Sequence, residues 1–221
     1  MNTRYNPFCQ IHKALRHALA ATLQQLQQAN AVDHESTAAV EQQITELIDM
    51  FEGHAHTEDT LFFPIVAQHA PDVVATIEAQ HAEDHRLGQE LQQALDAFVH
   101  ATKEERAHAM AQLLYSFSAF TAFNLNHMNE EELHLNPILW QVYSDDELMA
   151  FSAEVIKNIP PDKNAIYRKW MLRALSLPEI ETWYAAVRQS APAFVWHDFV
   201  EMAYRELPES KTRWLFRHKA A

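Results

Sequence analysis

The stretches HAHTEDTLFFP, residues 54–64, and HMNEEELHLNP, residues 127–137, are two versions of one pattern. Each begins with a histidine, has a glutamate four residues later, and has a proline six residues after the glutamate. Residues four apart lie one turn above the other on one face of a helix, so each stretch presents an imidazole and a carboxylate together. One HxxxE pattern arises easily by chance, but two copies with the same proline offset form an internal repeat. Two such helices side by side predict one metal site, and these ligand types suit iron, manganese or zinc.

The composition predicts an all-α protein and excludes several classes of partner. Only 2 of the 221 residues are glycine, and leucine, alanine, glutamine and glutamate are abundant, as in helical proteins. The formal net charge of −13 and the lack of a basic run make nucleic acids and anionic membranes poor partners. A single cysteine excludes an internal disulfide, and no stretch approaches the ~20 apolar residues of a membrane span. The N-terminal residues also lack the apolar core of a signal peptide, so we expect a cytoplasmic protein.

Apolar residues recur at helical spacing in four successive segments. The first extends from about residue 5 to residue 30, and the second from about residue 35 through Leu61 to a proline at position 64. The third begins near residue 71, and the fourth follows a capping-box pattern at residues 102–105 and is expected to end at Pro137. Short joints between long amphipathic helices predict an antiparallel up-down-up-down four-helix bundle.

Metal-ligand side chains occur on the apolar face of each predicted helix. The candidate ligands are His12, His54, Glu58, His81, His85, His127 and Glu131. His12 and His54 are 42 residues apart, and so are His85 and His127, which indicates two equivalent helical hairpins. A single inward histidine is more often a hydrogen-bonded core residue than a ligand. Burying five imidazoles and two carboxylates together without a cation would cost several kcal/mol, so the set as a whole predicts a metal.

Three further residues near the fourth-helix pattern are alternatives for the same site. Glu130 and Glu132 flank Glu131 and compete for its role, although only the four-residue offset repeats the geometry of the second helix. His134 lies one turn beyond Glu131 and is a candidate outer or alternative ligand. The other histidines are mostly off the apolar faces and are expected at the surface.

Four stretches together resemble the hemerythrin-like, or HHE cation-binding, family. They are IHKALRHAL around His12, HAHTEDTLFFP, EAQHAEDHRLGQEL and HMNEEELHLNP, and they follow one another in the order of that family's four helices. The resemblance covers about residues 8–140. It implies a four-helix bundle holding two non-haem iron ions with an oxo or hydroxo bridge, with Glu58 and Glu131 as bridging carboxylates and the histidines as terminal ligands.

The sequence departs from the oxygen-carrying members of the family on the fourth helix. Those proteins have HxxxxD there, whereas this chain has HxxxE, the pattern of the wider and functionally more varied HHE group. On the third helix the pair His81 and His85 matches the carriers. Many HHE proteins keep only one histidine there. The local pattern of those proteins favours His81 as that histidine, whereas the 42-residue symmetry favours His85. Both are predicted ligands.

The ligand count determines how many positions stay open. Two six-coordinate irons offer about twelve positions. Two bridging carboxylates, an oxygen bridge and five imidazoles would leave one position for dioxygen, peroxide or nitric oxide. Without His85 two positions would be open, and redox chemistry would be easier.

The pattern changes after residue 140, which predicts two domains. Residues 1–143 are expected to form the bundle, and residues 144–221 a C-terminal extension of shorter helices separated by prolines. The extension carries four tryptophans and no motif with ligand spacing. It is compatible with a cap on the bundle, a dimer interface or a surface for a protein partner.

Three functions are compatible with these features. The first is a di-iron protein that reversibly binds or senses dioxygen, nitric oxide or iron. The second is a di-iron oxidoreductase acting on peroxide or nitric oxide, or an iron donor in iron-sulfur repair. The third is a helical partner-binding protein whose site holds zinc or no metal. Whether the chain is an enzyme is left open by the sequence.

Overall fold

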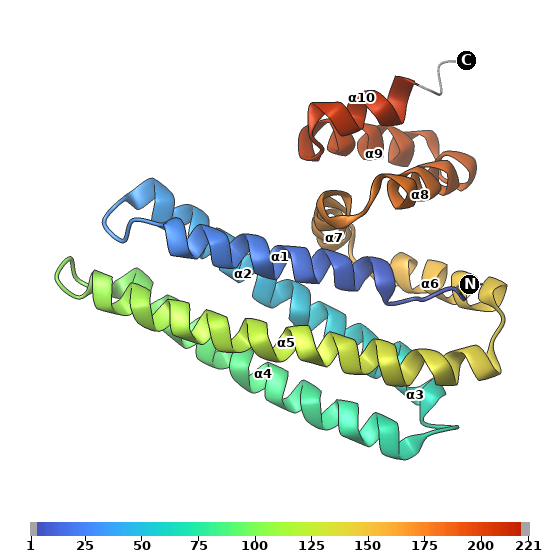
Figure 1. Ribbon diagram of the computed structural model, residues 1–221, viewed down its shortest axis with the longest axis horizontal. Helices are drawn as coiled ribbons and strands as arrows, with labels where there is room; N and C mark the ends of the chain where they lie inside the picture. The colour runs from blue at the N-terminus through green and yellow to red at the C-terminus, as the bar shows by residue number, and fades with distance from the viewer. Residues whose placement is uncertain (1–3, 218–221) are drawn as a thin grey trace. The chain divides into compact units, whose positions relative to one another are not determined.

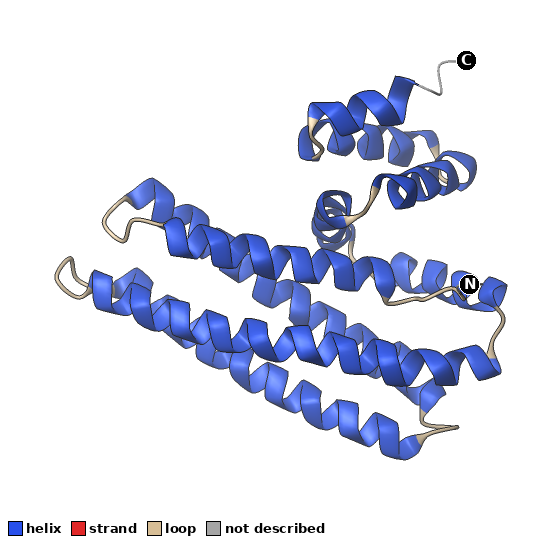
Figure 2. Ribbon diagram, in the orientation of Figure 1, coloured by secondary structure: helices blue, strands red, loops and turns tan. Residues whose placement is uncertain are grey.

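The computed structural model describes residues 4–217, and every regular element in that range is helical (Figures 1 and 2). This confirms the all-α prediction. The first elements are α1 (Cys9–Gln28), α2 (His34–Thr57), a π-helical turn η1 (Glu58–Phe62), α3 (Phe63–Val66), α4 (Pro71–His100), α5 (Arg106–Val142) and α6 (Asp145–Asn158). They are followed by α7 (Pro161–Ala174), α8 (Leu177–Ser190), α9 (Ala193–Glu206) and α10 (Glu209–Arg217). No helix in the described range is both long enough and apolar enough to cross a membrane.

Helices α1, α2, α4 and α5 form the predicted antiparallel bundle (Figure 1). Helix α1 packs against α2 and α5, and α4 packs against the same two helices. Each helix contributes fully buried apolar residues, such as Leu15, Ile44, Leu91 and Phe117. Burial of one apolar stripe per helix is the main source of stability in such a bundle.

The helix starts follow local sequence signals. The Asp33 carboxylate accepts a hydrogen bond from the backbone N–H of Glu35 at 3.2 Å and caps α2. Pro71 occupies the first turn of α4, where its missing N–H has no partner to lose. Helix α5 begins at Arg106, one turn after the predicted cap at Thr102, whose backbone N–H and hydroxyl donate to the Glu105 carboxylate.

A π-helical turn at η1 changes which side chains of the second helix point inward. The backbone N–H of Phe63 donates to the carbonyl of Glu58, five residues back rather than four. This extra residue shifts the helical phase, so Phe62 and Phe63 are buried and Leu61 is only partly buried. Leu61, where the uniform α-helical count continued, still packs against the core, but the inserted residue brings Phe63 to the inner face as well, which that count does not anticipate.

Pro137 does not end the fourth bundle helix, contrary to the sequence-based prediction. Helix α5 continues to Val142 with Pro137 inside it. The proline lies on the exposed side, and the residue four positions earlier, Leu133, is 65% exposed. The Leu133 carbonyl, which has no N–H donor at Pro137, therefore lies on the solvent side of the helix, where the missing hydrogen bond is tolerated.

The chain divides into two compact units, residues 1–159 and 160–221. The expected boundary was after residue 143, but α6 packs with the bundle. Leu148 of α6 is buried in a cluster with Phe8, Phe62 and Leu135, and the Phe151 ring meets the Phe62 ring edge to face at 4.8 Å. This cluster closes the end of the bundle next to η1.

The second unit has a hydrophobic core of its own. Leu172, Ile180, Phe199 and Leu215 are among its fully buried residues, and they come from four different helices, α7 to α10. Aromatic rings pack edge to face within it, including Tyr184 with Trp196 at 4.3 Å. The tryptophan-rich C-terminal helices thus use much of their aromatic surface internally.

Candidate metal centre

Six of the seven predicted ligands meet in the bundle interior. Two overlapping groups of side chains have ligand atoms within 4.8 Å of one another: His12, His54, Glu58 and Glu131, and His81, His127 and Glu131. All six residues are buried. They come from α1, α2, η1, α4 and α5, so the site requires all four helices of the bundle.

The two glutamates each divide their oxygens between two pairs of histidines. Glu58 Oε1 lies 3.2 Å from His54 Nε2, and Glu58 Oε2 lies 3.5 Å from His81 Nε2. Glu131 Oε2 lies 3.4 Å from His12 Nε2, and Glu131 Oε1 lies 3.0 Å from His127 Nε2. Two positions result, each facing two imidazoles and one oxygen from each carboxylate.

These separations match the spacing of ligands around metal ions. Metal–nitrogen and metal–oxygen bonds of about 2.0–2.2 Å place adjacent ligand atoms roughly 3 Å apart. His12 Nε2 and His54 Nε2 are 3.1 Å apart. Within the described range, both Glu58 oxygens and Glu131 Oε2 are buried without a hydrogen-bond partner. A cation at each position would satisfy all of these atoms, so the donor set fits two metal ions.

Three of the histidines are oriented by acceptors on their outer nitrogens. His12 Nδ1 donates to Glu132 at 3.0 Å, His81 Nδ1 to Asp59 at 2.7 Å, and His127 Nδ1 to Gln80 at 2.8 Å. A proton held on Nδ1 leaves the lone pair on Nε2 directed at the centre.

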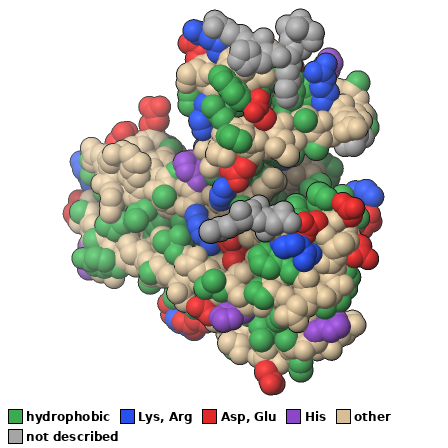
Figure 3. Space-filling model, turned by 45° about the vertical axis from the view of Figure 1, so that its right-hand side comes forward, with side chains coloured by type: hydrophobic (Ala, Val, Ile, Leu, Met, Phe, Trp, Pro, Cys, Tyr) green, Lys and Arg blue, Asp and Glu red, His purple; other side chains and the backbone are tan. Residues whose placement is uncertain are grey.

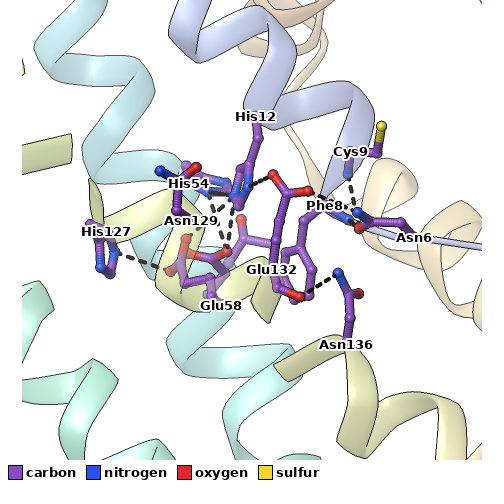
Figure 4. Close-up of polar contacts among 12 residues, drawn as sticks. Asn6, Phe8, Cys9, His12, His54, Glu58, His127, Asn129, Glu132 and Asn136 are labelled. Carbon is purple, nitrogen blue, oxygen red and sulfur yellow. Dashed lines mark hydrogen bonds and ion pairs between the residues drawn. The ribbon is translucent and has the colours of Figure 1, made fainter. Parts of the chain in front are cut away.

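The contact between Glu132 and His12 belongs to a larger network near the start of α1 (Figure 4). Glu132 reaches the His12 ring from the side opposite His54. Glu132 also accepts from Arg16 at 2.8 Å and from the Asn6 side chain at 2.9 Å. It is therefore a positioning residue for His12 and does not compete with Glu131 for the centre.

Phenylalanine rings stack on three of the imidazoles. Phe8 stacks on His12 with ring centroids 5.5 Å apart, Phe63 on His81 at 5.1 Å, and Phe123 on His127 at 5.8 Å. Phe63 reaches His81 because the π-helical turn brings it to the inner face. The stacked rings restrict the imidazoles and lower the polarity around the cluster.

The pKa values show that the protein groups alone attract positive charge. Burial lowers the pKa of His12, but contacts with Glu132 and Glu58 and the charge of Glu131 outweigh it and raise the pKa to about 9. Burial also lowers the pKa of His81, but contacts with Glu131 and Glu58 outweigh it and raise the pKa to about 11. For His54 burial dominates, and the pKa falls to about 4. Contacts with His127 and His81 overcome burial and hold the pKa of Glu131 well below its usual value.

His85 does not join the cluster. Its side chain is exposed, and its Nε2 lies 2.8 Å from the amide nitrogen of Gln89 on the next turn. The buried positions of α4 follow a spacing of alternately three and four residues, through Ile77, His81 and Asp84. His85 therefore falls just outside the inner face, and Asp84 takes the inward position. His134, the alternative ligand, is also on the outer side, where it pairs with Glu130 at 3.0 Å.

Several residues at the site were not singled out by the sequence. Asp59 directly follows the predicted ligand Glu58, and Gln80 directly precedes the predicted ligand His81. The contacts that these two residues make depend on the directions of neighbouring helices. A polar residue beside a predicted ligand was the only available signal. Asp84 and Asn124 lie three positions from His81 and His127, on the same helix faces.

Comparison with known families agrees with the geometry. The sequence model of the hemerythrin HHE cation binding domain matches residues 8–139, which include all six clustered residues. Comparison with curated proteins and with solved structures found no significant match. The matched range spans most of the bundle, from the residue before α1 to the last turn of α5. The chain belongs to the hemerythrin HHE cation-binding family, and its buried histidines and glutamates include two groups that could hold a metal ion.

Proposed function

We propose that the bundle holds two iron ions and reversibly binds dioxygen or nitric oxide at them. The proposed ligands are His12, His54, Glu58, His81, His127 and Glu131. The observation that carries the proposal is the division of each carboxylate between two histidine pairs. A carboxylate that faces both positions can bridge two cations, and the oxygen and imidazole ligands suit iron.

The proposed ligand set leaves room for small molecules. Two six-coordinate ions offer about twelve positions. Four imidazoles, four carboxylate oxygens and an oxygen bridge that counts once for each ion leave one position open on each ion. The rings of Phe8, Phe63 and Phe123, which stack on three of the proposed ligands, would surround a diatomic molecule bound there.

The exposure of His85 favours a second candidate function. With His85 at the surface, the site has one imidazole fewer than the sequence predicted, and a second open position. An open position on each ion suits an oxidoreductase acting on peroxide or nitric oxide, because a substrate can then contact both ions. Binding and turnover would use the same six residues.

The decisive experiment measures metal content and the visible spectrum of the purified protein. The protein is reduced without oxygen, exposed to dioxygen or nitric oxide, and then degassed. About two irons per chain and a spectral change that reverses on degassing are expected for reversible binding. Irreversible oxidation, with catalytic loss of added peroxide, would move the assignment to the oxidoreductase, and zinc or no metal would contradict both.

A matched pair of variants tests the ligand set. His81→Ala and His85→Ala remove imidazoles one turn apart on the same helix. We expect His81→Ala to lose iron and the spectral change, because its Nε2 faces both glutamates. We expect His85→Ala to keep about two irons per chain, because its ring is exposed. Equal loss of iron in both variants would contradict the proposed set.

A further inference from the structure

A second group of buried polar side chains lies next to His81 and His127 along the bundle. Asp84 on α4 and Asn124 on α5 are about one helical turn from these histidines, and Thr121 is about one turn further along α5. Asp84 is 6% exposed, Thr121 8% and Asn124 0%. None of the three belongs to the groups of candidate metal ligands. Buried polar groups with no structural task are rare in folded proteins, so this group needs an explanation.

The helix register places this group beside one half of the centre. Asp84 follows His81 by three residues, and Asn124 precedes His127 by three, so each shares a helix face with a proposed ligand. The two helices run antiparallel, and Asp84 and Asn124 therefore meet in the layer next to the two imidazoles. Burial raises the pKa of Asp84, while its bond to Asn124 and the charges of His127 and His81 oppose the rise, as expected for a carboxyl near both rings.

The orientation of the Asn124 amide follows from its neighbours. Its nitrogen donates to Asp84 Oδ1 at 2.6 Å and to the Phe120 carbonyl at 3.2 Å. Both partners are acceptors, so the amide oxygen must point the other way. That oxygen and the Thr121 hydroxyl are buried and have no hydrogen-bond partner among the described residues.

On α4 and α5 the positions four residues further along carry no polar side chain. They are Gly88 and Phe120, and an added Gly88 Cβ would lie 3.7 Å from the Phe120 ring. Leaving a buried carbonyl without a donor is unfavourable. The arrangement combines the acceptor oxygens of Asp84 and Asn124 with a hydroxyl that can accept or donate. The complementary ligand is a small molecule that carries an O–H group.

We propose that Asp84, Thr121 and Asn124 form a hydrogen-bonding subsite for a small O–H ligand, water or hydrogen peroxide, beside the His81 and His127 half of the centre. The inference rests on the proposed metal pair and specifies which ligands it favours. Hydrogen peroxide donates hydrogen bonds to the acceptors of the subsite. Nitric oxide has no proton to donate, so the subsite discriminates between the two molecules.

The test compares Asp84→Asn with Glu83→Gln. The first variant keeps the size of the side chain but replaces one acceptor oxygen with a donor. The second changes a carboxylate of the same helix that is partly exposed and pairs with Arg86. For each iron-loaded protein we would measure iron per chain, nitric oxide affinity, and the second-order rate constant of the spectral change caused by hydrogen peroxide.

The expected result is a selective loss. Asp84→Asn should lower the rate constant with hydrogen peroxide at least tenfold and change the nitric oxide affinity less than twofold, with unchanged iron content. Glu83→Gln should match the parent protein in all three measurements. Thr121→Val, which removes the buried hydroxyl without changing the size, should lower the peroxide rate constant about threefold. It provides the same test if Asp84→Asn does not fold.

Three outcomes would overturn the inference. They are an unchanged peroxide rate constant, a parallel loss of peroxide and nitric oxide responses, and a loss of iron, which would make Asp84 part of the metal-binding machinery. If the parent protein binds two irons and responds to both molecules, and the variants behave in the same way, only the subsite is contradicted. A parent protein that binds no iron defeats the proposed function, and the subsite with it.

Discussion

Hydrogen bonds to the outer ring nitrogens decide which nitrogen of each histidine faces the centre. In His12, His81 and His127 an oxygen acceptor holds the Nδ1 proton, so Nε2 is the nitrogen that would bind a metal. Glu132 has the most elaborate support of these acceptors, because Arg16 and Asn6 fix its two oxygens. The prearranged imidazoles do not have to reorient when a metal binds, which favours affinity.

Replacement of Glu132 should weaken metal binding without removing a ligand. We expect Glu132→Gln to lower iron affinity by about 10- to 100-fold, because it removes the charged acceptor that orients His12 and leaves Arg16 without its carboxylate partner. Competition with a chelator of known affinity measures the change. Glu130→Gln is the matched control, since Glu130 also flanks Glu131 but pairs with the exposed His134. Similar affinities for the two variants would contradict a positioning role.

Metal binding should release protons. The pKa values of about 9 for His12 and about 11 for His81 mean that both rings are protonated at pH 7.5 when only protein groups surround them. With its pKa near 4, His54 is already neutral. A metal must displace both protons, so about two protons should leave per loaded chain at pH 7.5, and affinity should rise with pH through about 9 and then less steeply up to about 11. Calorimetry in buffers of different ionisation enthalpy measures this release, and heats that do not depend on the buffer would contradict it.

At the scale of the elements, small departures from regular helices shape the site. The π-helical turn η1 directs both Phe62 and Phe63 inward and brings Phe63 onto the His81 ring. Pro137 lies within α5, whose last turns contribute Leu139 to the cluster that closes the bundle end. Helix α4 presents a narrow inner face on which His81 and Asp84 alternate with apolar residues.

Gly88 of α4 offers a stability test at this scale. It is buried mid-helix without a positive φ angle, and an added Cβ would meet the Phe120 ring at 3.7 Å, an ordinary contact distance. Gly88→Ala should therefore raise the free energy of unfolding by about 0.5–1 kcal/mol, the difference in helix propensity. The exposed Ala82→Gly on the same helix should lower it by a similar amount. Urea denaturation measures both changes, and a destabilised Gly88→Ala protein would show that the ring cannot accommodate the methyl group.

At the scale of the whole molecule, the chain has two units with separate cores. The candidate metal ligands lie entirely in residues 1–159, while residues 160–221 bury their own aromatic residues. On the face drawn in Figure 3, lysine and arginine side chains are scattered among acidic and apolar ones, with no single basic area. Because the candidate metal ligands all lie in residues 1–159, metal binding should affect the stability of the first unit only.

Metal should shift the unfolding of one unit and not the other. A metal at 100 times its dissociation constant stabilises the folded state by about 2.7 kcal/mol. Trp140 lies in the first unit, and the remaining tryptophans follow residue 159, so fluorescence of a Trp140→Phe protein reports the second unit. We expect iron to raise the thermal midpoint in far-UV circular dichroism but not in this fluorescence signal. His127→Ala should abolish the shift, and a shift in both signals would show that the units unfold together.

The sequence by itself determined the helical fold and the residue types of the centre. Helical spacing is a local property, so the repeated HxxxE pattern was enough to pair His54 with Glu58 and His127 with Glu131 across one turn. The low glycine content and the apolar stripes predicted a bundle, since such stripes can be buried only against one another. The resemblance to the family supplied the expectation of two irons.

Only the tertiary structure decided which residues of α4 and η1 reach the centre. His81 and His85 have the correct helical spacing to share a ligand role, but close packing against α5 leaves a narrow inner face that includes Asp84 and excludes His85. In the same way, the inserted residue of the π-helical turn places Phe63 on His81, in a phase that uniform helical periodicity does not give. The periodicity of a sequence fixes spacing along one helix. The rotation of that helix about its axis is set by the neighbours against which it packs.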